Sequence, residues 1–134
     1  MTRTSNPAFR FVLDEHTGVP VYRQIIDQVR GAIASGALYA GVQLPTVRQL
    51  AVDLAINPNT VVRAYRELEL GGLLETQQGT GTFISAQKSA RGNAERERQL
   101  GQIVADCVAR AGAAGFTVVD LIEQLRRLDS PRGR

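Results

Sequence analysis

The residues best suited to specific chemistry lie in the run NPNTVVR, between Asn57 and Arg63. An asparagine amide can form two hydrogen bonds with adenine, and an arginine guanidinium can form two with guanine. Asn59, Thr60 and Arg63 fall within the first two turns of the helix expected here, where recognition helices usually touch base edges. We therefore expect this segment to read a DNA groove, with Asn59 and Arg63 as the main base-reading residues.

A base-reading helix also needs an apolar face that anchors it. Apolar residues recur at helical spacing through the same segment, at Val61, Ala64, Tyr65 and Leu68. Asn57 is expected to cap the helix and Pro58 to fill its first position, where a missing N–H costs nothing. Gly71 and Gly72 should end it, so the sequence predicts a helix over about 58–70.

A second helix is expected just before this one, joined to it by a tight turn. Thr46 is its predicted N-cap, and Gln49 three residues later completes a capping box. Arg48 lies just inside the helix start, on the side away from the apolar residues, where it could clamp a phosphate or reach a base. Two roles stay open for Thr46 and Gln49, namely bonds to phosphate or capping alone.

A glycine-rich tip follows, flanked by two short strands that are expected over 73–76 and 82–84. Gly79 and Gly81 would let the tip approach a minor groove closely, and Gln78 or Thr80 could donate hydrogen bonds there. The alternative is that these glycines only form a tight turn. Helix, turn, helix and hairpin in this order predict a mainly α fold with a small β-hairpin wing, a winged helix-turn-helix.

The segment before these elements is expected to supply one more helix. Its apolar stripe consists of Ile25, Ile26, Val29 and Ile33. Pro20 fits the first turn, and Gly36 should supply a left-handed cap. Residues 37–44 are predicted to form a loop. Alternating apolar and polar residues predict a short strand further upstream, at Phe9, Phe11 and Leu13.

Two C-terminal amphipathic helices are expected after a linker over 85–93, with Thr117 capping the second. Two such helices cannot bury both apolar stripes as an isolated hairpin, so we expect them to pair with a second copy. Packing onto the same subunit is the alternative. The predicted domains are 8–86 for DNA binding and 92–129 for dimerisation. The predicted dimerisation residues are Leu100, Ile103, Val104, Cys107, Val108, Leu121, Ile122, Leu125 and Leu128.

The composition of the 134-residue chain limits which classes of function are possible. The chain is 43% hydrophobic and carries a net charge of +3. That charge is too small to argue DNA binding by itself. The single Cys107 and single His16 allow no intrachain disulfide or Cys/His zinc site, so no metal or cofactor is expected, and Cys107 should be a buried hydrophobe. Without an apolar signal core or a membrane-spanning run, we expect a cytoplasmic protein.

Three separated runs resemble the N-terminal domain of the GntR family of bacterial transcription regulators. They are LPTVRQLA at 44–51, INPNTVVRAYRELE at 56–69 and GTGTF at 79–83. With the preceding helix, the resemblance covers about 8–85. It implies DNA contacts by Arg48, by Asn59, Thr60 and Arg63, and by Gly79 to Gly81. Many members in other branches of the family carry an arginine where this chain has Pro58, so the contacts of those members at that position do not carry over.

The NPNT run and the short C-terminal part look most like the YtrA-type subfamily. That resemblance implies a two-helix dimerisation region and repression of operons that encode ABC-type transporters. The C-terminal part should offer little room for a ligand cavity of ordinary size, about 300–1,000 Å³. The identity of any small-molecule effector stays open: a ligand could bind between subunits instead, or derepression could use another cue.

The leading hypothesis is a sequence-specific, dimeric repressor that binds a palindromic operator. The helix over 58–70 would enter the major groove, and the wing over 77–82 would meet the minor groove. The predicted DNA-binding residues are Thr46, Arg48, Gln49, Asn57, Asn59, Thr60, Arg63, Gln78, Gly79, Thr80 and Gly81. The alternative is a winged-helix protein-interaction module, which would more often expose apolar residues on that helix. No nucleophile–base or paired-carboxylate arrangement occurs, so we expect no enzyme.

Overall fold

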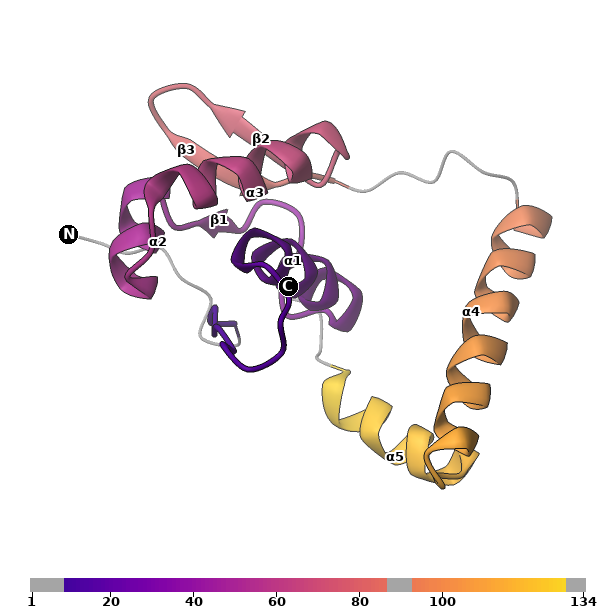
Figure 1. Ribbon diagram of the computed structural model, residues 1–134. Helices are drawn as coiled ribbons and strands as arrows, with labels where there is room; N and C mark the ends of the chain where they lie inside the picture. The colour runs from indigo at the N-terminus through magenta and orange to yellow at the C-terminus, as the bar shows by residue number, and fades with distance from the viewer. Residues whose placement is uncertain (1–8, 87–92, 130–134) are drawn as a thin grey trace. The chain divides into compact units, whose positions relative to one another are not determined.

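The computed structural model describes residues 9–86 and 93–129, which form two compact units on either side of the gap (Figure 1). The described elements are, in chain order, α1 (Val21–Ser35), β1 (Gln43–Leu44), α2 (Val47–Leu54), α3 (Pro58–Leu70), β2 (Leu74–Gln77), β3 (Gly81–Ile84), α4 (Asn93–Ala113) and α5 (Val118–Leu128). The fold is mainly α with a small antiparallel sheet, a winged helix-turn-helix followed by two helices. The predicted fold class is confirmed.

Local capping signals set the helix ends in the first unit. Pro20 precedes α1, and Gly36 ends it with a left-handed φ of 88°. Asn57 caps α3, its side chain accepting a hydrogen bond from the Asn59 N–H at 2.8 Å, and Pro58 fills the first position. These caps confirm the predicted starts and ends. Each one provides a hydrogen-bond partner or a backbone conformation for the N–H or C=O groups that have no partner within the helix.

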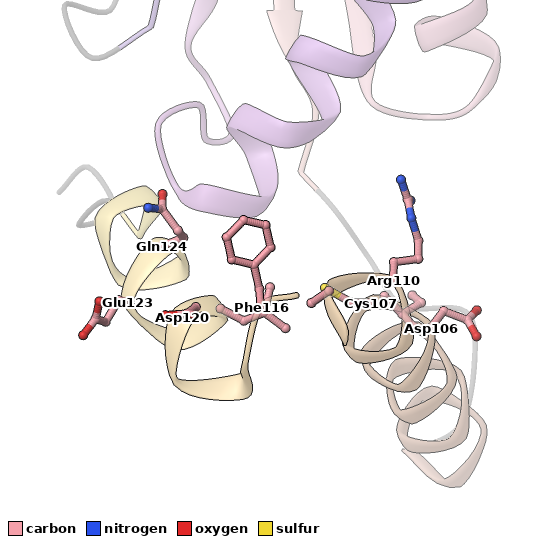
Figure 2. Close-up of a pocket in the computed structure, with 10 residues that line it drawn as sticks. Asp106, Cys107, Arg110, Phe116, Asp120, Glu123 and Gln124 are labelled. Atoms are coloured by element: carbon pink, nitrogen blue, oxygen red, sulfur yellow. The ribbon is translucent and has the colours of Figure 1, made fainter. Parts of the chain in front are cut away.

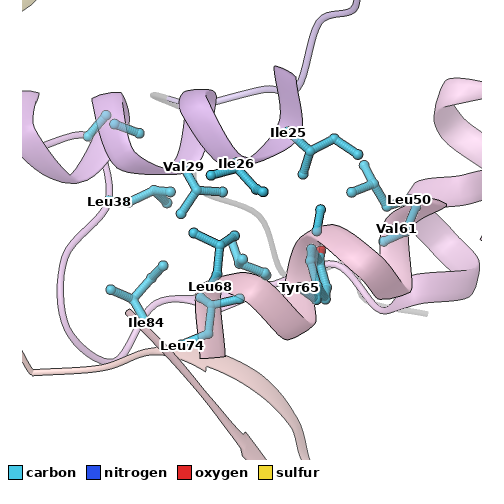
Figure 3. Packing of buried hydrophobic residues seen from close by; sticks show 14 of the residues in the cluster. Ile25, Ile26, Val29, Leu38, Leu50, Val61, Tyr65, Leu68, Leu74 and Ile84 are labelled. Atoms are coloured by element: carbon cyan, nitrogen blue, oxygen red, sulfur yellow. The ribbon is translucent and has the colours of Figure 1, made fainter. Parts of the chain in front are cut away.

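The core of the first unit lies between α1 and α3 (Figure 3). Ile25, Ile26 and Val29 of α1 face the apolar side of α3, and all three are fully or almost fully buried. Leu50 of α2 closes one end, and Leu74 with other sheet residues closes the other. Burying each such side chain contributes about 1.5–3 kcal/mol, so this packing fixes the orientation of α3.

The sheet has the strand order β1-β3-β2, with every pair antiparallel. Leu74 pairs with Ile84 and Gln77 with Gly81 across the hairpin, while Gln43 of β1 pairs with Phe83. The hairpin strands confirm the prediction with shifts of one residue. The predicted loop over 37–44 is wrong at its end, where Gln43 and Leu44 form β1. A strand of two residues is too short to show an alternating pattern, and it forms only because it pairs with the distant β3.

The predicted strand at Phe9, Phe11 and Leu13 is wrong. Side chains of α1 bond the backbone there: Gln28 accepts from the Val12 N–H at 2.9 Å and donates to the Val12 carbonyl. The Phe9 and Phe11 rings meet edge to face at 4.8 Å and pack against the core. The segment is extended, yet no neighbouring strand pairs with it among the described residues.

The second unit consists of α4 and α5. Thr117 and Asp120 form a capping box at the start of α5, as the sequence predicts for Thr117. No described residue between 94 and 129 is buried. Most of the predicted linker over 85–93 lies outside the described residues. No single described helix is long and apolar enough to span a membrane, and α4 with α5 meets that criterion only jointly, across a 118° bend.

Candidate nucleic-acid interface

The helix α3 has two unlike faces, as predicted. Its buried residues are Val61, Ala64, Tyr65 and Leu68. On the other side, Asn59 and Arg63 are exposed and Thr60 is half-buried. Within the part of the chain that the structure describes, the Asn59 side-chain amide has no hydrogen-bond partner, so its donors and acceptor are available. Arg66, one turn after Arg63, is also exposed. The resulting surface is narrow and polar, with two cations.

The guanidinium of Arg63 lies over the ring of Tyr22, with its carbon 3.7 Å from the ring centroid. Tyr22 belongs to the first turn of α1 and is half-buried. No ion pair joins Arg63 to any residue in 9–86 or 93–129, so its charge is not neutralised by a described acid. Sequence reasoning missed Tyr22, because no periodic pattern relates a residue in α1 to one in α3.

The turn between α2 and α3 is short and strained at one position. Ala55 has a φ of 57°, and its N–H bonds back to the end of α2. The Ile56 N–H also returns to the Ala51 carbonyl at 3.0 Å, which closes the helix end. Asn57 then caps α3, because its side-chain oxygen accepts a hydrogen bond from the Asn59 N–H. This capping role holds whether or not the side-chain NH2 group also makes a contact at an interface.

The start of α2 confirms the predicted capping box. The Thr46 hydroxyl accepts from the Gln49 N–H, and the Thr46 N–H donates to Gln49 Oε1, both at 3.0 Å. Capping is therefore an observed role of both side chains, while phosphate binding stays a prediction. Arg48 is exposed, and it forms no ion pair within the described ranges.

Tyr65 connects the two helices of the motif. It is buried in the core, and its hydroxyl donates to the carbonyl of Pro45, just before α2, at 2.7 Å. Burial raises the pKa of the Tyr65 phenol above its ordinary value of 10.0, because the phenolate would lose its hydration. The bond fixes the start of α2 relative to α3, and thus Arg48 relative to Arg63.

The hairpin tip depends on both glycines. Gly79 has a φ of 80° at the third position of a turn that the Thr80 N–H closes onto the Gln77 carbonyl at 2.9 Å. Gly81 has a φ of 140°, and a Cβ there would lie 2.3 Å from Gln43 Nε2. That Nε2 donates to the Thr80 carbonyl at 3.0 Å. The alternative role as turn residues therefore explains both glycines without DNA.

Gln43 and Glu69 hold the wing, and sequence reasoning missed both. Gln43 projects from β1, which was expected to be loop, and its side chain reaches the tip. Glu69 accepts a hydrogen bond from the Thr76 hydroxyl and so connects the C-terminal end of α3 to β2. Gln78 and Thr80 are exposed at the tip. Among the residues that the structure describes, no hydrogen bond or ion pair joins the tip, Arg48 and the polar face of α3 directly; the shared core positions these three parts.

The second unit exposes its apolar residues. Among the predicted dimerisation residues, Val108 and Leu121 are half-buried, and the others are exposed: Leu100, Ile103, Val104, Cys107, Ile122, Leu125 and Leu128. The expectation that Cys107 is buried is wrong for the single chain, because α4 and α5 diverge and leave it open.

A groove of about 790 Å³ lies between α4 and α5, where Cys107 and Phe116 face the open space (Figure 2). Its polar lining includes Asp106, Arg110 and Asp120. The expectation of little room for a ligand cavity in this part is therefore wrong. The two helices meet at a steep angle, so they leave an open groove between them instead of packing along their length.

Comparisons with known proteins bear on this arrangement. The sequence profile of bacterial regulatory proteins of the gntR family matches residues 21–84. The uncharacterized helix-turn-helix transcriptional regulator YhcF of Bacillus subtilis is 33% identical over 107 residues, which cover 80% of this chain and 88% of YhcF. The chain belongs to the GntR family. It is a helix-turn-helix transcriptional regulator.

Two further proteins resemble this chain over shorter stretches. The transcriptional repressor YtrA of Bacillus subtilis is 45% identical over 73 residues, and the match spans 54% of this chain and 56% of that repressor. The solved structure of YtrA from Sulfolobus acidocaldarius superposes with a TM-score of 0.55 at 29% identity, over 74% of this chain and 97% of that one. The YtrA-type resemblance inferred from the NPNT run is thus supported.

Proposed function

We propose that this GntR-family regulator is a dimeric repressor that reads a palindromic operator with α3. One observation carries the proposal: α3 presents Asn59 and Arg63 to solvent, directly opposite the face that the core buries. A helix of this kind can enter a major groove without losing its anchorage. Arg63 suits guanine and Asn59 suits adenine, and Thr60 adds a donor beside them.

The surrounding residues support contacts to the DNA backbone. Arg48 is exposed and unpaired within the described ranges, so its charge is available for a phosphate. Thr46 and Gln49 keep a hydroxyl proton and an amide group beyond the capping box. At the wing, Gln78 and Thr80 are exposed on a tip with the narrow backbone that a minor groove admits. Phosphate contacts supply affinity and base contacts supply specificity.

The exposed apolar residues of the second unit support dimerisation. α5 has 11 residues, fewer than the 12–15 that an isolated helix needs for even marginal stability, and none of them is buried in one chain. A second copy would cover these side chains. A two-fold dimer then presents two α3 helices to half-sites about one helical turn apart, roughly 34–36 Å, or a multiple of that.

Repression is proposed because the related YtrA of Bacillus subtilis is a transcriptional repressor. A dimer on an operator can block transcription by occupancy alone, without enzymatic chemistry or a cofactor. Action on chromosomal DNA would place the protein in the cytoplasm. The alternative, a winged-helix module that binds protein instead of DNA, finds less support because the exposed face of α3 carries Asn59, Arg63 and Arg66 instead of an apolar patch.

Selection of bound sequences from a random DNA pool, at one stated salt concentration, tests the proposal. We expect enrichment of a palindrome with fixed half-site spacing, and a complex of two chains per operator by analytical ultracentrifugation. Enrichment of a single, non-repeated site with one chain bound would contradict the dimeric account. No enrichment at low ionic strength would contradict DNA recognition itself.

A further inference from the structure

Tyr22 is held in a fixed position at the start of α1. The Pro20 carbonyl accepts from the N–H groups of Arg23 and Gln24, both at 3.1 Å, which closes the first turn around it. The ring is half-buried and packs against the core shared by α1 and α3. The Arg63 guanidinium lies over its face, 3.7 Å from carbon to ring centroid. The ring is thus a rigid support for a side chain on the polar face.

This contact leaves the hydrogen-bonding capacity of Arg63 intact. A guanidinium carries five N–H donors in its plane, whereas a ring attracts it through its face. A stacked arginine therefore keeps all its in-plane donors for a base edge. Free arginine side chains carry about 2 kcal/mol of rotamer entropy, some of which must be lost on binding. Stacking removes part of that freedom before DNA arrives.

The Arg63 charge has no competing partner among residues 9–86 and 93–129. The one ion pair in those residues joins Arg98 to Glu95, in the second unit. An acidic partner would neutralise the charge and would have to be displaced by DNA. An aromatic ring needs no displacement, because its contact and a base contact use different parts of the guanidinium.

We propose that Tyr22 is a positioning residue that orients Arg63 to read one guanine in each half-site. The proposal rests on the DNA-binding function proposed above, and it names Tyr22 as a specificity-determining residue outside the helix-turn-helix. A ring that only packed on the surface would affect stability alone. A positioning ring affects the preference for one base pair.

The test measures dissociation constants for the selected operator and for versions with each base pair replaced, at fixed salt. Arg63→Ala should flatten the preference at one position, by about 5- to 150-fold. Tyr22→Leu should weaken the preference at that same position by about 2- to 30-fold. Tyr22→Phe keeps the ring face and should stay near the wild type. The double variant Tyr22→Leu with Arg63→Ala should lose no more preference there than Arg63→Ala.

Each contrary result has a distinct meaning. If Arg63→Ala flattens one position and Tyr22→Leu leaves it unchanged, or weakens all sequences equally and additively, the role of Tyr22 is refuted while DNA recognition stands. If Arg63→Ala changes no preference, Arg63 does not read a base and the role of Tyr22 fails with it. If the wild-type protein selects no sequence, the proposed function itself fails.

A measurement on the wild-type protein keeps the proposal testable should Tyr22→Leu fail to fold. The Tyr22 ring current should shift the Arg63 side-chain proton resonances upfield in NMR spectra of the free protein. We expect that shift to persist in the operator complex. Loss of the shift on binding would show that Arg63 leaves the ring to reach DNA, and would overturn the proposal.

Discussion

At the scale of single residues, the spacing of polar and apolar residues is enough to predict the polar face of α3. The contacts that hold α3 in place cannot be predicted from that spacing. Asn59 and Arg63 project from the side opposite the apolar positions, as a period of 3.6 residues requires. Tyr65, which that same period assigns to the core, also makes a polar bond that the sequence does not reveal. Its hydroxyl donates to the Pro45 carbonyl and thereby relates α2 to α3.

Tyr65→Phe removes this hydrogen bond and should lower the free energy of unfolding by about 1 kcal/mol near neutral pH. The wild-type advantage should hold up to about pH 10, because the phenol is neutral in both states there. Above that pH the unfolded chain ionises first, since burial raises the pKa of the folded phenol, so the advantage should shrink as pH rises.

Urea unfolding of both proteins between pH 7 and 11 measures this difference. The two proteins differ only at position 65, so the difference between them reports on Tyr65. A wild-type advantage that grew above pH 10 would contradict the assignment, because it would mean that folding favours the phenolate.

The residue scale also shows where sequence reasoning stops. Thr46, Gln49, Asn57 and Pro58 were assigned to their caps correctly, because capping depends on neighbours within three positions. The contact of Arg63 with Tyr22 depends on how two helices cross, which no local pattern encodes.

At the scale of elements, the wing and the turn before α3 depend on backbone conformation. Gly79 and Gly81 both have positive φ, but only Gly81 also faces the Gln43 side chain. The hairpin was predictable from its glycines and flanking apolar residues. The third strand was not, because β1 has two residues and owes its existence to pairing with β3.

Gly79→Ala should cost roughly 1 kcal/mol of folding free energy, since left-handed backbone disfavours a Cβ. Gly81→Ala should cost more, about 1–3 kcal/mol, because a φ of 140° disfavours a Cβ and the Gln43 amide would have to move aside and give up its hydrogen bond to the Thr80 carbonyl. Combining Gly81→Ala with Gln43→Ala should recover the part of the lost folding free energy that comes from the contact with the Gln43 side chain. Thermal unfolding of the wild type and these three variants measures the differences. Equal losses for both glycines would contradict the role given to Gln43.

Ala55→Gly should raise the free energy of unfolding by about 0.5–1 kcal/mol. Ala55 has a φ of 57°, which costs an L residue roughly 1–2 kcal/mol, and glycine gives back part of that gain through its freedom in the unfolded chain. Ala34→Gly, at an exposed position within α1, is the control and should lose about 1 kcal/mol. Denaturant unfolding that showed both variants destabilised would refute the turn strain.

At the scale of the whole molecule, the two units differ in how far they bury their apolar residues. The first unit buries its core within one chain. In the second, Leu125 is 57% exposed and Ile122 is 41% exposed. The two amphipathic helices were predictable from the sequence. The angle between them was not, and the groove it creates contradicts the expectation of a part too small for a cavity.

Leu125→Glu should break the proposed dimer. Two charges would enter the interface in place of two leucines that contribute about 1.5–3 kcal/mol each, so the dimer dissociation constant should rise by about 100-fold or more. Arg127→Gln makes the same change in charge on the opposite face of α5 and should leave the dimer intact. Sedimentation equilibrium compares the variants. A monomeric wild type would refute the proposal and favour packing within one subunit.

A salt titration of operator binding tests whether the polar face of α3 reads operator DNA. The wild-type dissociation constant should rise steeply between 50 and 200 mM salt, on the order of 10³-fold if the dimer contacts about six phosphates. Asn59→Ala with Arg63→Ala should bind the operator no better than unrelated DNA. If that double variant kept the wild-type preference, or if the wild type formed no complex at 50 mM salt, the account would be contradicted.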